Sequence, residues 1–231
     1  MEQTKESQYQ HQVSIRETEG LETLGLTTNH CWRDDPRHLL FILARSKFVS
    51  KMLSGSERVL EVGCGDAFGA RLVQQEVANL SAVDFDPVFV NDVNARMSPR
   101  WKFDCHVHNM LDGPVAGEFD AAYSLDVIEH IDASQEKVFV GNIAKSLVTN
   151  GVLIIGTPSI QSQVYASSYS KQGHINCKDA GQLKALMKEF FHNVFIFSMN
   201  DEVVHTGYYP MAHYLFALCV GNKLASKNGA A

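Results

Sequence analysis

The stretch that decides the fold is Val59-Leu60-Glu61-Val62-Gly63-Cys64-Gly65-Asp66. It predicts a short buried strand that runs into a glycine turn, followed by a helix from about Gly69. Since glycine has no Cβ, such a turn can adopt positive φ and lie directly against a ligand. Asp84 ends a second apolar run soon afterwards. In a doubly wound sheet, a carboxylate at the end of the second strand accepts hydrogen bonds from ribose hydroxyls. The two features therefore indicate an adenosine-containing ligand.

The bulk composition is that of one α/β domain. The chain has 231 residues, 45% of them hydrophobic and 20% charged, and its net charge is −6. Without a basic cluster, nucleic acid is not expected as the main partner. No apolar run approaches the roughly 20 residues of a membrane span, and the N-terminus has no secretion signal. An odd number of cysteines without framework spacing indicates a reducing, cytoplasmic location. The cysteines are Cys31, Cys64, Cys105, Cys177 and Cys219.

Strands and helices are expected to alternate, which is typical of parallel sheets with βαβ crossovers. We expect an α/β fold, Rossmann-like and doubly wound, with a mostly parallel seven-stranded sheet, an antiparallel last strand and an N-terminal helical cap. The expected strands are 58–62, 80–83, 103–108, 119–124, 151–156, 194–199 and 214–220. The expected helices are 36–53, 69–77, 87–97, 133–147 and 178–191.

Three further segments complete the predicted organisation. Residues 1–20 lack periodicity and are expected to form a polar, mobile tail. Residues 21–231 are expected to form a single domain, in which residues 21–32 fold over the ligand as a cap. Residues 157–176 are expected to form a long polar loop, and loops of that length in a compact domain are usually functional or disordered.

The ordered set of motifs resembles the class I S-adenosylmethionine-dependent methyltransferases, in particular the ubiquinone-biosynthesis type and related small-molecule enzymes. The resemblance covers the chain from about Asp35 onward. The motifs that carry it are Glu61-Val62-Gly63-Cys64-Gly65, Asp84-Phe85-Asp86, Phe119-Asp120, Asp126-Val127-Ile128-Glu129-His130 and Gly151-Val152-Leu153-Ile154-Ile155-Gly156-Thr157-Pro158.

The resemblance implies how S-adenosylmethionine is held. The backbone of Gly63, Cys64 and Gly65 would line the methionine part of the cofactor. Asp84 would accept charge-assisted hydrogen bonds from both ribose hydroxyls. Phe85 would lie against the adenine ring.

The same resemblance implies a second set of cofactor contacts. Asn109 and Met110 would meet the edge of adenine, and Leu125 would touch the methionine end. Arg45 would lie near the cofactor carboxylate, and Glu61 belongs to the same set through its place in the glycine motif.

Two positions depart from the family pattern. Ala67 replaces the third glycine of the usual run, and Asn109 replaces an aspartate. Neither change abolishes the expected site. Nicotinamide binding is the main rival, but it requires G-x-G-x-x-G for a pyrophosphate at a helix N-terminus, and Phe68 stands at the sixth position.

Histidines beyond the carboxyl ends of the strands are the candidate catalytic bases, since an imidazole titrates near neutrality. His174 is the first candidate, and its alternative role is to cap the following helix or to bond a loop carbonyl. For His130 a structural hydrogen bond is the competing interpretation. His205 could enter the acceptor pocket from the far side. The segment Cys105-His106-Val107-His108 matches no zinc template, so no metal site is expected there. The metal-dependent catechol type of the family requires a specific acidic constellation that the sequence does not show, so a metal-independent mechanism is favoured.

The acceptor is expected to be a polar small molecule, such as a sugar or hydroxylated metabolite, because the loop after the fifth strand is rich in serine. Tyr165 and Asn176 in that loop, with His205, are candidate acceptor contacts. The expected activity is O-methylation. Two alternatives stay open: an N-methyltransferase acting on an amino sugar or amine, and a catalytically silent nucleoside-binding protein. The sequence gives no indication of the oligomeric state.

Overall fold

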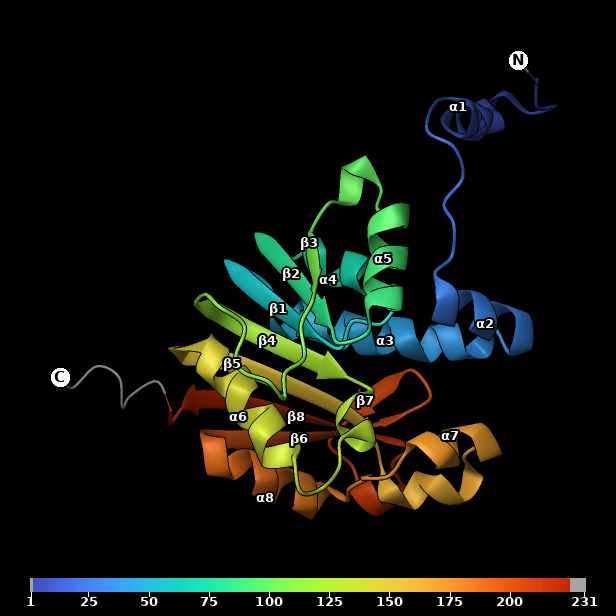
Figure 1. The fold of residues 1–231 in the computed structure, drawn as a ribbon. Coiled ribbons are helices and arrows are strands. Elements are labelled where there is room, and N and C mark those ends of the chain that lie inside the picture. Colours follow the sequence, from blue (N-terminus) through green and yellow to red (C-terminus); the bar gives the residue numbers. More distant parts are fainter. Residues whose placement is uncertain (1, 225–231) are drawn as a thin grey trace.

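Helices and strands alternate along residues 2–224, the part of the chain that the computed structural model describes (Figure 1). The strands are β1 Arg58–Val62, β2 Asn79–Asp84, β3 Asp104–Val107, β4 Phe119–Leu125, β5 Leu147–Pro158, β6 Phe191–Asn200, β7 Val203–His205 and β8 Tyr214–Asn222. The α-helices are α1 Gln10–Thr18, α2 Leu26–Asp34, α3 Arg37–Met52, α4 Ala70–Gln74, α5 Pro87–Arg96, α6 Glu136–Ser146, α7 Ser168–Gly173 and α8 Ala180–Phe190. Short 3-10 helices are η1 Ser7–Tyr9, η2 Pro99–Trp101, η3 Ile128–His130, η4 Ile160–Tyr165 and η5 Tyr209–Met211.

The strands form one sheet in the order β3-β2-β1-β4-β5-β8-β6-β7. Strands β1 to β5 pair in parallel, whereas β8 lies antiparallel between β5 and β6. The predicted fold class is therefore confirmed. The described part of the chain has eight strands instead of seven, because residues 203–205 turn back after β6 and pair with its last residues.

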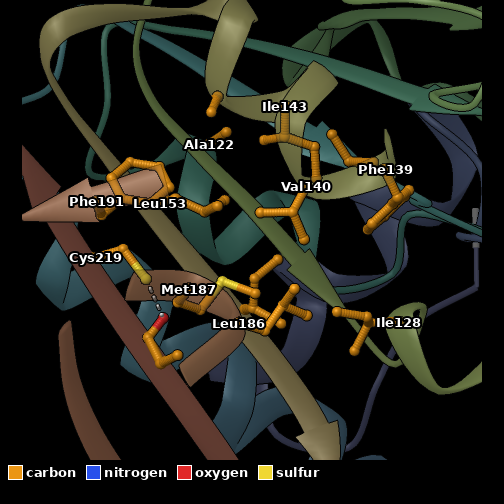
Figure 2. Packing of buried hydrophobic residues seen from close by; sticks show 14 of the residues in the cluster. Ala122, Ile128, Phe139, Val140, Ile143, Leu153, Leu186, Met187, Phe191 and Cys219 are labelled. Carbon is orange, nitrogen blue, oxygen red and sulfur yellow. Dashed lines mark hydrogen bonds between the residues drawn. The ribbon is translucent and has the colours of Figure 1, made fainter. Parts of the chain in front are cut away.

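Helices cover both faces of the sheet, and each face has its own core. Along β1 the side chains alternate, so Leu60 and Val62 join one core and Val59 joins the other. The first core contains α6 and α8, and Figure 2 shows Phe139, Val140 and Leu186 packed in it. The second core contains residues of α3, α4 and α5. This two-sided burial explains why the strands read as nearly continuous apolar runs.

Local sequence chemistry sets where several helices begin. The Asp86 carboxylate accepts a hydrogen bond from the backbone N–H of Val88, and Pro87 is the first residue of α5. Helix α8 begins with a capping box in which Asp179 and Gln182 each accept from the other's backbone N–H. These caps follow directly from short-range sequence patterns.

Two predicted irregular segments are helical in part. The N-terminal segment contains α1, which buries no residue and stands apart from the sheet in Figure 1. The segment 157–176 begins within β5 and then contains η4 and α7. The hydroxyls of Ser159 and Ser167 cap these two short helices. The serine-rich composition had predicted a loop, but two of these serines begin helices instead.

The carboxyl ends of the parallel strands gather the segments that matter for function. The expected cap is present as α2, which lies with α7 on the side toward which β4 points (Figure 1). Ligands of open α/β sheets bind at this edge. Within residues 2–224 no helix has the length and apolar character that crossing a membrane requires.

Candidate active site

The glycine turn after β1 forms a cradle with an open side. Gly63 and Gly65 have φ of 73° and 52°, which favours glycine at both positions. A Cβ added to Gly63 would come within 2.4 Å of Val127, so only glycine fits against that side chain. A Cβ added to Gly65 would meet no atom within 4 Å. The turn therefore packs on one side and presents bare backbone on the other.

Asp84 and Phe85, at the end of β2, complete this cradle. The Asp84 carboxylate accepts hydrogen bonds from the backbone N–H groups of Gly65 (2.8 Å) and Asp86 (3.0 Å), and the residue is only 7% exposed. Each carboxylate oxygen keeps a lone pair for a further donor. Phe85 is 71% exposed. A fixed carboxylate beside an exposed aromatic ring suits a nucleoside, which offers hydroxyls and a flat base.

Glu61, in β1 two residues before Gly63, places a buried carboxyl group next to the glycine turn. Its side chain is buried, and Oε2 has no hydrogen-bond partner among the described residues. Burial raises the pKa of Glu61 to about 8, although the neighbouring Tyr123 hydroxyl lowers it, and the nearby Asp66 and Asp84 also raise it. A buried, unpaired carboxyl oxygen at a ligand cradle is suited to bind a cationic group.

The residues expected at the adenine edge have partners inside the protein. Asn109 Oδ1 accepts from the backbone N–H of Leu111 at 3.0 Å. Met110 is buried, and its carbonyl accepts from Asn142 Nδ2 at 2.8 Å. The structure thus places both residues just after β3, beside the cradle, with the Asn109 amide oxygen already engaged once.

Arg45 forms an ion pair with Asp126 and also lines a cavity. Its guanidinium donates to both carboxylate oxygens of Asp126, at 3.0 and 2.8 Å, and lies 3.9 Å from the ring centroid of Tyr214. Asp126 follows Leu125, the last residue of β4, and has a positive φ of 57°. Since Val127 packs on Gly63 in the same loop, the ion pair adjoins the glycine turn.

A cavity of about 740 Å³ opens beyond this ion pair. Its volume lies within the range of small-molecule sites. Helix α3, the segment after β5 and the chain before β8 form its walls. The lining includes the predicted residues Arg45, Tyr165 and His174, and the others are His38, Phe41, Pro158, Gln161, Ser162, Gln163, Val164, Ala166, Pro210, Met211, Ala212, His213 and Tyr214.

The two candidate catalytic histidines lie side by side. The ring centroids of His130 and His174 are 5.2 Å apart. Nδ1 of His130 lies 2.8 Å from the carbonyl oxygen of Gly173, and Nδ1 of His174 lies 3.0 Å from Gln163 Oε1. Burial lowers the pKa of His174, as does the neighbouring His130, so its neutral form is favoured.

Glu129, next to this histidine pair, is fully buried. Its Oε2 accepts from Thr157 Oγ1 at 3.1 Å, and burial together with the neighbouring Asp126 raises its pKa to about 8. The sequence motif that ends in Glu129-His130 had drawn attention to His130 alone. The sequence signal that could have indicated Glu129 is its position directly before His130, in the motif that follows the predicted strand 119–124.

The other two predicted acceptor contacts lie outside the cavity lining. Asn176 donates to Glu136 and accepts from Lys178. His205, in β7, pairs through Nε2 with Asn200 Oδ1 at 2.9 Å.

The cap is held by a contact that short-range patterns do not indicate. The backbone N–H and the hydroxyl of Thr28, in α2, both donate to Asp66 Oδ2 at 2.7 Å. Asp66 follows Gly65 directly, so α2 is tied to the glycine turn.

Comparison with known sequences agrees with this geometry. A family model described as a methyltransferase domain matches residues 32–190, from within α2 to the end of α8. A probable S-adenosylmethionine-dependent methyltransferase of Mycolicibacterium smegmatis is 33% identical over 103 residues, which are 44% of this chain and 38% of that protein. One from Mycobacterium tuberculosis is 32% identical over 102 residues, with 44% and 35% covered. The match thus spans little more than a third of these curated relatives.

Solved structures share the fold at low sequence identity. The N-methyltransferase NodS from Bradyrhizobium japonicum, in complex with S-adenosyl-L-homocysteine, has a TM-score of 0.59 and 20% identity, covering 82% of this chain and 91% of that chain. A TehB-like SAM-dependent methyltransferase from Corynebacterium glutamicum has a TM-score of 0.62 and 13% identity, covering 84% and 96%. The family model matches more than half of this chain, and the chain therefore belongs to the methyltransferase domain family.

Proposed function

We propose that this protein transfers a methyl group from S-adenosylmethionine to a hydroxyl of a polar small molecule, such as a sugar or hydroxylated metabolite. One observation carries the proposal: the glycine cradle with Asp84 and Phe85 adjoins, across the Arg45–Asp126 ion pair, a cavity of about 740 Å³. A nucleoside cofactor and an acceptor can thus meet end to end at the carboxyl edge of the sheet.

The cradle fits S-adenosylmethionine. Asp84 would hold the ribose hydroxyls, Phe85 would cover the adenine ring, and the open face of Gly65 admits the cofactor against the backbone. The unpaired Glu61 oxygen would receive the cofactor ammonium group. When bound, the cofactor would supply a methyl group activated by a sulfonium centre, with the sulfur as the leaving group. The protein supplies alignment, which can contribute roughly 7–11 kcal/mol to catalysis.

The cavity walls combine a mainly apolar surface with several polar groups, which suits an acceptor that is both cyclic and hydroxylated. Gln161, Ser162 and Gln163 provide amide and hydroxyl groups, and Phe41 and Tyr165 provide aromatic surface. A hydroxyl must lose its proton as it attacks. Without a metal ion, that proton would go to Nε2 of His174, because Nδ1 faces Gln163.

All five cysteines are free, which supports the proposed cytoplasmic location. None of them forms a disulfide bond with another.

The test is a radiolabelled methyl-transfer assay with purified protein over matched acceptors that carry either hydroxyls or amines. We expect labelled ether products, and we expect S-adenosylhomocysteine to bind in calorimetry. Transfer to amines alone would favour the N-methyltransferase alternative. Cofactor binding without transfer to any acceptor would favour a silent nucleoside-binding protein, and a failure to bind S-adenosyl compounds would refute the proposal.

His174→Ala should lower turnover about 10²-fold or more, because a general base contributes 10²–10⁴-fold. S-adenosylhomocysteine affinity should stay unchanged, since His174 lies on the acceptor side. Single-turnover rates and calorimetry measure the two effects. A variant with the wild-type rate would remove His174 from the chemistry.

A further inference from the structure

We propose that Glu129, His130 and His174 bind a divalent first-row transition-metal cation, such as Mn²⁺ or Zn²⁺, beside the acceptor cavity. Glu129 and His130 belong to η3, and His174 directly follows α7. One ligand atom from each residue joins a group whose members all lie within 4.8 Å of one another. Ligands about 2.1 Å from a single ion lie at most about 4.2 Å apart, so small side-chain movements would close the site.

The Glu129 side chain supplies independent evidence for a missing partner. The residue is 0% exposed, and Oε1 has no hydrogen-bond partner anywhere in residues 2–224. Its other oxygen is engaged by the Thr157 hydroxyl. An unsatisfied polar atom in the interior is costly, and each such atom in a native protein calls for an explanation. A cation bound at Oε1 would satisfy it.

Both imidazoles are held in the tautomer that ligates metals. The Gly173 carbonyl faces Nδ1 of His130, and the Gln163 amide oxygen faces Nδ1 of His174. Since an oxygen acceptor requires a proton on Nδ1, Nε2 of each neutral ring keeps its lone pair. Metal-ligating histidines almost always donate their other N–H to such an acceptor. Thr157, Gly173 and Gln163 thus orient all three ligands.

The type of ligand set indicates the class of ion. Two imidazoles and one carboxylate suit zinc and other first-row transition metals, and three protein ligands leave positions open for water or substrate. Asp126, the nearest other carboxylate in the same loop, is already paired with Arg45. Residue spacing could not predict the site because His174 lies in another segment of the chain.

The inferred role rests on the proposed function. His174 lines the acceptor cavity, so a cation at this site could take an acceptor hydroxyl as a further ligand. Binding to a divalent cation lowers the pKa of a hydroxyl, which then loses its proton to water. His174 would in that case act as a ligand rather than as the base.

The test measures binding of Mn²⁺ and Zn²⁺ to the chelator-treated full-length protein, by calorimetry and, for Mn²⁺, by electron paramagnetic resonance. We expect one cation per chain and at least a ~10-fold loss of affinity in Glu129→Gln, His130→Ala and His174→Ala. His106→Ala, an exposed histidine of β3, is the matched control and should bind as the wild type does. Unchanged S-adenosylhomocysteine binding shows that each variant is folded, and Glu129→Gln keeps the shape of the side chain.

Binding weaker than millimolar, or equal binding by wild type and Glu129→Gln, would overturn the cation site. The methyl-transfer assay with and without chelator separates this inference from the proposed function. Stoichiometric cation binding without transfer to any hydroxyl would refute the function and leave the site standing. Transfer at the same rate in chelated, metal-free protein would refute the cation's role and leave His174 as the base.

Discussion

At the scale of single residues, the Asp84 carboxylate binds backbone N–H groups and is also the proposed contact to the cofactor ribose. Its carboxylate already accepts two backbone N–H groups, which hold it in position at the end of β2. A carboxylate that is fixed before binding loses little side-chain freedom when a ligand arrives. Asp84 should therefore contribute more to affinity than a flexible surface aspartate.

Asp84→Ala should raise the dissociation constant of S-adenosylhomocysteine by ~10-fold or more, because hydrogen bonds to a charged group contribute roughly 1.5–3 kcal/mol. Calorimetry measures the change. Asp104→Ala, on the edge strand β3, serves as the control and should bind normally. Unchanged affinity in Asp84→Ala would exclude this carboxylate from the cofactor site.

Glu61 should make the stability of the cofactor-free protein depend on pH. Its folded pKa of about 8 lies above the ordinary value of 4.5, so between these values the folded state binds a proton that the unfolded state has lost. Stability from this group is therefore present at low pH and falls as pH rises, by up to ~1.4 kcal/mol per pH unit. Denaturant unfolding between about pH 5 and pH 7.5 should show a flatter profile for Glu61→Gln than for the wild type. Glu57→Gln, at an exposed neighbouring position, is the control, and parallel profiles for wild type and Glu61→Gln would contradict the prediction.

At the scale of secondary structure elements, α2 and α7 close the site from two sides. Neither helix is long, and each depends on contacts with a distant turn. Helix α2 is held through Thr28 and Asp66, and α7 presents the Gly173 carbonyl to His130. Short helices are marginal on their own, so these contacts decide whether the elements form and dock.

Thr28→Val should loosen α2, because it removes the hydroxyl donor from a buried carboxylate and costs ~1–3 kcal/mol. Hydrogen exchange of residues 26–34 should accelerate, while exchange in the sheet stays unchanged. Thr27→Val is the matched control, since Thr27 is exposed in the same helix. Equal protection of α2 in both variants would contradict the docking role of Thr28.

At the scale of the whole molecule, the sheet and its two cores form the stable unit, whereas α1 stands apart from them (Figure 1). None of the residues of α1 is buried. Apolar burial is the main source of folding free energy, so α1 should add little to it.

Deletion of residues 2–19 should shift the thermal unfolding midpoint by no more than ~2 °C, because surface changes of this kind stay within about 0.5 kcal/mol. Calorimetry or circular dichroism measures the midpoint, and S-adenosylhomocysteine affinity should also be retained. A loss of several degrees would mean that α1 packs against the domain in solution.

The amino-acid sequence by itself determined the alternation of strands and helices, the glycine turn after β1, and the place of Asp84. These features depend on apolar runs, caps and turn residues that act over a few neighbouring positions. The sequence did not predict the helical structure in residues 10–18 and 160–173, because short helices show only a weak periodicity of apolar residues.

Only the tertiary structure decided which distant side chains meet. Arg45 and Asp126 are 81 positions apart, Thr28 and Asp66 are 38 apart, and His130 is 43 positions from the carbonyl that orients it. Such pairs form when crossover helices pack on the sheet and bring loop ends to one edge. This packing decides which side chains lie in contact at that edge. The spacing of the same residues along the chain does not reveal those contacts.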